Sequence, residues 1–218
     1  MKLYGYWRSS AAYRVRIALN LKSLAVEEEF IHLQKNDQRS DDYLALNPQG
    51  LVPTLIDGDV RLSQSLAILE YLDECHPETA LLPSDIPGRA RVRQLAQVVA
   101  CDIHPIDNLK VLNFLTGELG VSAEGRLTWY RHWVDQGLEG LEGLVADCVD
   151  TGLFCHGDQP TIADLCLVPQ LYNARRFDVD LSPYPTLQRI DRACHALDAF
   201  ASAAPEKQPD AATTVRVC

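Results

Sequence analysis

The stretch "YGYWRSSAAYRVRIALN", residues 4 to 20, predicts a strand followed by a helix at the beginning of the chain. Residues 2 to 6 alternate as a strand does, and residues 10 to 22 follow the period of a helix. Ser9 and Ser10 lie at the junction, where a redox protein would carry a Cys-x-x-Cys pair. A helix N-terminus offers free N–H groups and a partial positive charge, so this junction predicts a site for an anion.

The two serines also have a simpler explanation, which accounts for part of the pattern. Serine is a favoured N-cap and contributes about 1 kcal/mol to a helix. A cap explains one serine, but not two with Arg8 before them and Arg14 after them. A thiolate at a helix N-terminus has a lowered pKa, and a hydroxyl donor lowers that pKa further. Because no cysteine stands here, we expect the thiol to come with a ligand.

The composition is that of an ordinary globular protein of 218 residues, enough for one large domain or two small ones. No run of about 18 apolar residues appears, so we expect no membrane-spanning helix. The first residues lack the apolar segment of a signal peptide, which favours the cytoplasm. Seven cysteines occur without a Cys-x-x-Cys pair, so we expect no metal site and free thiols that are buried except for the terminal Cys218.

The net charge of −10 makes nucleic-acid binding improbable, but the charge is unevenly distributed. Residues 1 to 26 hold five basic residues and no acidic one, so the rest of the chain carries a net charge of −15. A cationic region in an acidic protein suits small anionic ligands. A solvated basic surface is the alternative explanation.

The first 83 residues predict a small α/β domain. A second strand is expected over residues 26–33, and the strands "LVPTLID" and "VRLS" flank Asp57-Gly58-Asp59, which is a hairpin signal. A short helix ends before Asn47-Pro48, and a longer helix covers residues 63–72. The predicted order is therefore β-α-β-α-β-β-α.

The sequence after a proline-rich linker near residues 83 to 87 predicts helices only. The expected helices cover residues 89–115, 124–149, 161 onward and 187–200. Pro105 and Pro169 should bend the first and the third of them, and Thr161 with Asp164 has the spacing of a capping box. The tail "APEKQPDAATT" is expected to be loose. We therefore expect an all-α domain over residues 88–218, joined to the α/β domain over residues 1–83.

Two further features of the first domain favour a small ligand. Pro53 follows Val52 at the start of an apolar strand, which implies a sheet edge, a bulge or a cis bond. A cis bond would leave the backbone of Val52 free to pair with a peptide ligand. Gln64 and Ser65 open the next helix, either as a plain cap or as an anion site in which Ser65 holds a carboxylate and Gln64 orients it.

These three features, in this order, resemble the glutathione transferase superfamily. The first half is similar to its thioredoxin-like domain and the second half to its helical domain, so the resemblance covers nearly the whole chain. The segments "SSAAYRVRIALNLK", "LNPQGLVPTL", "LSQSLAILEYLDE", "PTIADLCLVPQLYNARRF" and "LSPYPTL" are similar to the zeta class. That class contains glutathione-dependent cis–trans isomerases of aromatic catabolism, so the resemblance implies glutathione as the cofactor.

The resemblance assigns the glutathione site residue by residue. Ser9 matches the hydroxyl that supports the glutathione thiolate, and Ser10 and Ala11 match its neighbours in the site. Ala11 is a departure, because the zeta motif usually reads Ser-Ser-Cys. The residues that match those holding the glutathione backbone and its glutamyl end are Gln38, Val52, Gln64 and Ser65.

Three residues of the second domain match family positions that reach glutathione, either in the same subunit or from the partner subunit of a homodimer. His104 stands where the family usually has Gln, and Asn108 and Lys110 are expected on the same helix face one turn further along. Arg176 matches an arginine associated with the substrate's carboxylate. Its neighbour Arg175 is commonly acidic in the family, and either adds positive charge for a dianionic substrate or faces solvent.

The arginines divide into expected substrate ligands and structural residues. Arg14 and Arg16 are two residues apart and point to different faces of their helix, so at most one reaches the site. We expect Arg14 to reach the site and Arg16 to make a structural ion pair. The groups expected to hold the substrate's carboxylates and the developing enolate are Arg8, His104 and Arg176.

The resemblance implies a cis–trans isomerase that acts on a small dicarboxylate keto acid. Maleylpyruvate and maleylacetoacetate differ by one methylene, and the departures at Ala11, His104 and Arg175 favour maleylpyruvate. A transferase that conjugates glutathione to an apolar acceptor would share the thiol site. A non-catalytic glutathione-binding protein would share it too, without turnover.

Overall fold

The computed structural model describes residues 1–211. The described chain packs as two compact units, one made of Met1–Ala80 with residues 195–211, the other of Leu81–Cys194. The helices after residue 195 therefore pack with the α/β unit, although they follow the all-helical sequence along the chain. The domain boundary near residues 83 to 88 stays a prediction.

The first unit is built on a four-stranded mixed sheet of order β2-β1-β3-β4. The strands are β1 (Lys2–Gly5), β2 (Glu27–Phe30), β3 (Thr54–Asp57) and β4 (Val60–Ser63). β1 runs parallel to β2 and antiparallel to β3, with Leu3 opposite Glu28 on one side and Leu55 on the other. β3 and β4 form the predicted hairpin, in which Gly58 has φ +56, a conformation that glycine adopts without strain.

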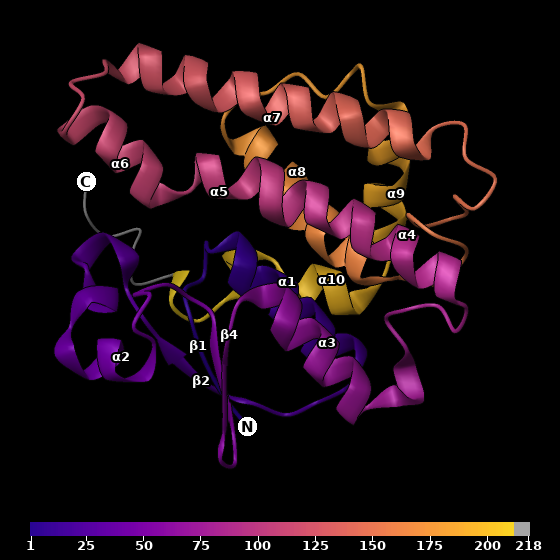
Figure 1. The fold of residues 1–218 in the computed structure, drawn as a ribbon, viewed down its shortest axis with the longest axis horizontal. Helices are drawn as coiled ribbons and strands as arrows, with labels where there is room; N and C mark the ends of the chain where they lie inside the picture. The colour runs from indigo at the N-terminus through magenta and orange to yellow at the C-terminus, as the bar shows by residue number, and fades with distance from the viewer. Residues whose placement is uncertain (212–218) are drawn as a thin grey trace. The chain divides into compact units, whose positions relative to one another are not determined.

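Helices cover both sides of this sheet. α1 (Ser10–Leu21) and α3 (Ser65–Cys75) pack against each other on one side, and α2 (Asp41–Leu46) lies on the other (Figure 1). Short 3₁₀ turns, η1 (Leu33–Lys35), η2 (Asp37–Arg39) and η3 (Pro77–Thr79), connect them. The side chains of Val15, Ile17 and Leu69 are wholly buried, as the apolar period of both helices predicts. The element order β-α-β-α-β-β-α is confirmed.

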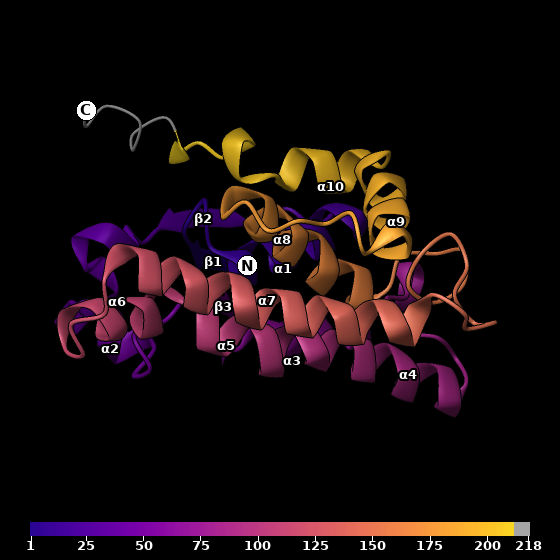
Figure 2. The same ribbon diagram turned by 90° about the horizontal axis from the view of Figure 1, so that it is seen from above.

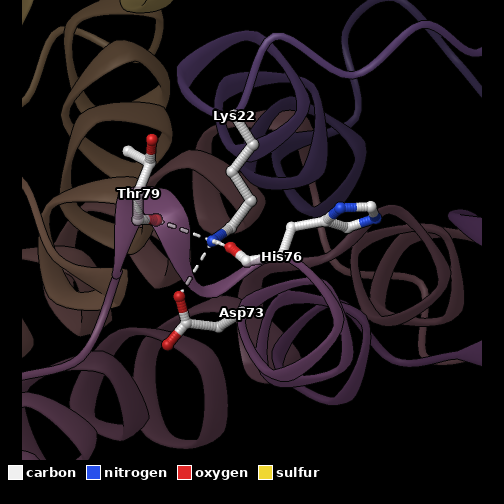
Figure 3. A network of polar contacts seen from close by, with 4 residues as sticks. All are labelled: Lys22, Asp73, His76 and Thr79. Carbon is white, nitrogen blue, oxygen red and sulfur yellow. Dashed lines mark hydrogen bonds and ion pairs between the residues drawn. The ribbon is translucent and has the colours of Figure 1, made fainter.

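Lys22, the residue that ends α1, ties this helix to the end of α3 (Figure 3). Its ammonium donates to Asp73 Oδ1 at 2.9 Å, to the His76 carbonyl at 2.8 Å and to the Thr79 carbonyl at 2.7 Å. The side chain is 1% exposed, so all three donors of a buried cation are satisfied inside the protein.

The C-terminal residues complete the first unit. α10 (Asp198–Ala203) packs on α1, where the Tyr13 hydroxyl donates to the Phe200 carbonyl. η5 (Pro205–Lys207) follows, and Ala211 is buried. The expectation of a loose tail was therefore wrong up to residue 211. The remainder of that tail and Cys218 lie outside the described residues.

The second unit consists of helices. They are α4 (Ile86–Gln97), the π-helix η4 (Val98–Ile103), α5 (His104–Asp107), α6 (Leu109–Gly117), α7 (Ala123–Val145), α8 (Ile162–Arg176) and α9 (Pro185–His195). α7 runs beside the row formed by α4, α5 and α6, and α4 packs on α8 (Figure 2). Among the described residues of this unit no strand occurs.

Two helices predicted as continuous are interrupted. The helix expected over 89–115 ends at Asp107, because Asn108 has ψ 162, outside the helical region, and restarts α6 as its N-cap. Pro105 is the second residue of α5, which continues directly from the π-helix η4, and the helical conformation ends after Asp107. The predicted bend at Pro105 stays a prediction. The helix expected over 187–200 is divided into α9 and α10.

The predicted capping box of α8 is present. Asp164 Oδ2 accepts from the Thr161 N–H at 2.7 Å and from the Thr161 hydroxyl at 2.9 Å, while Oδ1 accepts from the Cys155 N–H. Burial raises the pKa of the Asp164 carboxyl, and these hydrogen bonds oppose that rise. The box thus fixes the start of α8 and the loop before it.

The described cysteines are free thiols, as expected, but only half of them are fully buried. Cys155, Cys166 and Cys194 are buried, whereas Cys75 and Cys101 are exposed. Across residues 1–211, the side chains form no cluster that could hold a metal ion. Within the same range, no helix is long and apolar enough to cross a membrane.

Candidate active site

Ser9 caps α1 through its oxygen. Its Oγ accepts from the Ala12 N–H at 3.2 Å, and its own N–H donates to the Tyr6 carbonyl at 2.9 Å. The side chain is half-buried, and accepting the cap bond leaves its proton available to donate. Ser10 is buried behind it, and Ala11 is half-buried. The cap and a hydroxyl donor for an anion are therefore compatible functions of Ser9.

Arg8 precedes Ser9 and is half-buried. Its guanidinium carbon lies 4.9 Å from the centre of the Trp7 ring, a cation–π distance. The contact keeps this charge beside the start of α1, where it adds to the positive end of the helix dipole.

Arg14 lies beneath the start of α3. It is 2% exposed, and its Nη1 donates to Ser65 Oγ at 3.1 Å. Its Nε and Nη2 have no hydrogen-bond partner among the described residues. A buried cation with unused donors beside a helix N-terminus favours an anion there. Arg14 therefore holds the Ser65 side chain at the start of α3. Its contact with the acid substrate stays a prediction.

Arg16 makes different contacts from those expected. It is buried and donates to the carbonyls of Ala203 at 3.2 Å and Trp7 at 2.9 Å, and more weakly to that of Tyr6. Backbone oxygens therefore bind this guanidinium, where an ion pair was predicted.

Gln64 precedes α3 with φ +74, an uncommon conformation for a residue other than glycine. Its Nε2 donates to Gln49 Oε1 at 3.0 Å, so its side chain leaves α3 uncapped and points to the loop before β3. Gln38 is half-buried in η2, and its buried Oε1 has no partner within the described chain. Both amides can still accept or donate hydrogen bonds to a peptide-like ligand.

The Val52–Pro53 peptide bond is cis. Val52 packs, together with Leu33, against a cluster formed by Tyr6, Trp7 and Ala211. The structure therefore brings Val52 close to the turn that carries Arg8 and Ser9.

The predicted residues of α5 and α6 lie on either side of the break between these helices, with Asn108 at the break itself. His104 begins α5 and is half-buried, and Lys110 is exposed. Asn108 caps α6, since its Oδ1 accepts from the Val111 N–H at 3.1 Å and its Nδ2 donates to the Pro105 carbonyl at 2.8 Å. The expectation that these residues share one helical face was wrong, because the helix ends before Asn108.

Arg176 ends α8 beside aromatic side chains. Its guanidinium carbon lies 4.6 Å from the Phe177 ring centre, and Phe177 stacks on Tyr130 of α7 at 3.8 Å. The guanidinium is exposed and held at Nη1 by Asn173 at 3.4 Å. An exposed cation on an aromatic surface can receive a carboxylate with little rearrangement.

Arg175 is not available in the same way. Its Nη2 forms an ion pair with Asp191 of α9, whose side chain is 5% exposed. The pair neutralises the charge that was offered as support for a dianionic substrate, so Arg175 no longer contributes to that argument.

Asp107 is a buried carboxylate that sequence reasoning missed. It is 7% exposed, and neither of its oxygens has a hydrogen-bond partner among residues 1–211. Burial raises the pKa of its carboxyl from 3.8 to about 7. Burial is the main cause that raises the pKa of the Tyr130 hydroxyl; Asp107 adds to this rise and Arg176 opposes it. The three residues are therefore electrostatically connected within the second unit.

Asp107→Asn is expected to stabilise the protein at pH 8 and not at pH 5. The folded protein holds this proton more tightly than the unfolded chain, so wild-type stability falls as the pH rises from about 4 to about 7. An amide carries no charge, and the variant should gain about 1–3 kcal/mol above that range. Urea unfolding at pH 5 and at pH 8 measures the change in the free energy of unfolding. Asp102→Asn, at an exposed carboxylate of the same segment, is the control, and an equal gain at both pH values would contradict the assignment.

Two family models match the chain, one in each half. The glutathione S-transferase N-terminal domain matches residues 1–74, and the glutathione S-transferase C-terminal domain matches residues 128–206. A probable maleylacetoacetate isomerase of Vibrio cholerae is 53% identical over 211 residues, which are 96% of this chain and 97% of that protein. The chain therefore belongs to the glutathione S-transferase family.

Two solved structures are similar to this chain over nearly its whole length. The holo structure of a maleylpyruvate isomerase, a bacterial glutathione transferase of the zeta class, has a TM-score of 0.94 and 48% identity, and covers 96% of this chain and 99% of that chain. The maleylacetoacetate isomerase of Anaeromyxobacter dehalogenans, with dicarboxyethyl glutathione and citrate in its active site, has a TM-score of 0.85 and 48% identity, with 96% of each chain covered. The predicted glutathione transferase fold and the resemblance to the zeta class are confirmed.

Proposed function

We propose that this protein is a glutathione-dependent cis–trans isomerase that converts maleylpyruvate to fumarylpyruvate. The observation that carries the proposal is the start of α1, where the half-buried Ser9 accepts the cap bond and can still donate from its hydroxyl, with no cysteine beside it in the sequence. Such a place stabilises a thiolate that the protein itself does not supply.

The residues of the first unit fit glutathione. Ser65 at the start of α3, whose hydroxyl oxygen accepts from the buried Arg14, fits the glutamyl carboxylate. The amides of the half-buried Gln38 and of Gln64 fit the peptide part, as does the backbone of Val52. When bound, glutathione supplies a thiolate that adds to the cis double bond, permits rotation about the resulting single bond and leaves unconsumed.

The chain's own residues hold the thiol and the acid substrate. Ser9 donates a hydrogen bond from its hydroxyl to the sulfur, which lowers the thiol pKa and favours the thiolate. Arg8 and Arg176 bind carboxylates, and His104 adds a donor for the enolate oxygen. His104, Asn108 and Lys110 are also proposed to reach glutathione, in a cytoplasmic homodimer. The adduct of glutathione with a dicarboxyethyl group bound by the Anaeromyxobacter relative supports this chemistry.

Maleylacetoacetate is the second candidate substrate, because the Vibrio relative at 53% identity carries that name. One methylene in a pocket is worth only about 1–3 kcal/mol, so both acids should be turned over. Ala11 and His104 continue to favour maleylpyruvate, whereas the Arg175–Asp191 pair removes the third argument.

The test is the turnover of both maleyl acids with and without glutathione. We expect isomerisation to require glutathione and to leave its concentration unchanged, with a larger kcat/KM for maleylpyruvate. A chlorinated aromatic acceptor in a parallel assay measures conjugation. Isomerisation without glutathione would contradict the mechanism, and conjugation faster than isomerisation would favour a conjugating transferase. Binding of glutathione without either reaction would favour a non-catalytic protein.

A further inference from the structure

Both backbone polar groups of Trp7 are held by charged side chains from elsewhere in the first unit. The Trp7 N–H donates to Asp210 Oδ2 at 2.9 Å, and its carbonyl accepts from Arg16 Nη2 at 2.9 Å. Trp7 lies in the turn between β1 and α1, directly before Arg8 and Ser9. These two bonds therefore fix the backbone of the turn that presents the thiol-binding groups.

Asp210 belongs to a C-terminal segment, residues 205–211, that is itself anchored. Gln208 Nε2 donates to the carbonyls of Ser202 at 3.0 Å and Ala204 at 2.9 Å, which fastens the segment to α10. Ala211 is 8% exposed and packs in one cluster with Tyr6 and Trp7. The segment thus meets the turn through an apolar contact as well as through the Asp210 hydrogen bond.

One buried cation and two carboxylates lie beside the contact. A cavity of about 10 Å³, room for about one water molecule, is lined in part by Arg16, Glu28 and Asp210. Burial lowers the pKa of Arg16 to about 10, and the negative charges of Glu28 and Asp210 oppose that fall. Asp210 therefore both holds the Trp7 N–H and helps Arg16 to stay charged and hold the Trp7 carbonyl.

We propose that the C-terminal segment is a positioning element of the thiol site, in which Asp210 holds the Trp7 backbone so that Arg8 and Ser9 keep their places. Asp210 acts through Trp7 rather than on the ligand, so it is a positioning residue. The inference rests on the proposed glutathione site. A displacement of about 1 Å in a catalytic group can lower the rate by up to about a hundredfold. Loss of a hydrogen bond that positions such a group can therefore lower the rate measurably.

The test compares Asp210→Ala with Asp210→Asn, which loses the charge but keeps an oxygen that can accept from the Trp7 N–H. Lys207→Ala, an exposed residue of the same segment, is the control. Each variant is assayed for maleylpyruvate turnover at saturating glutathione, for glutathione affinity by calorimetry, for the pKa of the bound thiol by ultraviolet absorbance of the thiolate, and for melting temperature.

We expect Asp210→Ala to lower kcat about tenfold and to raise the bound thiol pKa, with glutathione affinity changed less than about threefold. Asp210→Asn and Lys207→Ala should stay close to wild type. Asp210→Ser, too short to reach the Trp7 N–H, replaces Asp210→Ala if that variant does not fold. Wild-type kcat and thiol pKa in Asp210→Ala, even with a lower melting temperature, would overturn the proposal.

Two other outcomes can be distinguished from a positioning role of Asp210. A lowered thiol pKa in both Asp210→Ala and Asp210→Asn would show a direct effect of removing negative charge, and would overturn the positioning role. Failure of the wild-type protein to bind glutathione would instead overturn the proposed function, before any variant is compared.

Discussion

Ser9→Ala is expected to lower glutathione-dependent turnover about a hundredfold and to raise the pKa of the bound glutathione thiol. The variant loses the hydroxyl donor to the sulfur, so less thiolate is present at neutral pH and it is less well placed. It also loses the cap bond to the Ala12 N–H, which should cost about 1 kcal/mol of stability. The pH profile of turnover and the thiolate absorbance of the complex measure the two effects.

Ser40→Ala is the matched control for this variant. Ser40 caps α2 by accepting from the Tyr43 N–H at 3.3 Å, so it has the same structural role at another helix. Its loss should destabilise the protein by a similar amount and leave turnover unchanged. Ser9→Thr keeps a hydroxyl and should retain most of the activity. If Ser9→Ala and Ser40→Ala behaved alike, Ser9 would be a cap and nothing more.

Lys22→Met is expected to destabilise the protein by about 3–5 kcal/mol, the largest stability effect predicted. The ammonium meets Asp73 and two carbonyls at the end of α3 while only 1% exposed (Figure 3). Methionine fills the same space but donates nothing, so a buried carboxylate and two carbonyls lose a partner. The free energy of unfolding from urea titration measures the loss.

Lys2→Met is the control, because Lys2 pairs with Glu27 and Glu29 on the surface of the sheet. Exposed pairs contribute little, so this variant should resemble wild type. A Lys22→Met protein as stable as Lys2→Met would contradict the prediction. It would mean that the interactions of the buried Lys22 only compensate for the cost of removing these groups from water. If Lys22→Met is destabilised as expected, the double variant Lys22→Met with Asp73→Leu should recover part of the lost stability, since no buried charge remains.

Local patterns predicted the elements whose causes are local. The strand and helix around Ser9, the hairpin at Gly58 and the capping box of Thr161 and Asp164 depend on neighbouring residues, and all are present. The break after Asp107 was missed because the apolar period continues through it and was given more weight than the local cap signal of Asn108, whose Oδ1 accepts from the Val111 N–H. The packed tail was missed because its composition is polar and its partners lie at the other end of the chain.

The candidate site divides in the same way. Ser9, Ser65 and Gln64 could be chosen from the sequence because helix N-termini carry their own signal in residue type and position. The partners of the arginines could not, since a guanidinium on a helix reaches groups that chain position does not reveal. Arg16 binds carbonyls, Arg175 binds Asp191, and only the fold shows which charges remain for a ligand.

An α/β unit followed by helices, with a helix start that carries Ser9 and Ser10 and no cysteine, could be predicted without the structure. These features follow from the periodicity and caps of short segments, which act over a few residues. The contact of Arg14 with Ser65, the burial of Asp107 with no hydrogen-bond partner among residues 1–211 and the bond of Asp210 to Trp7 could be seen in the folded structure alone. Burial and hydrogen bonding between distant segments fix these roles, because they depend on which groups lose water together when the chain folds.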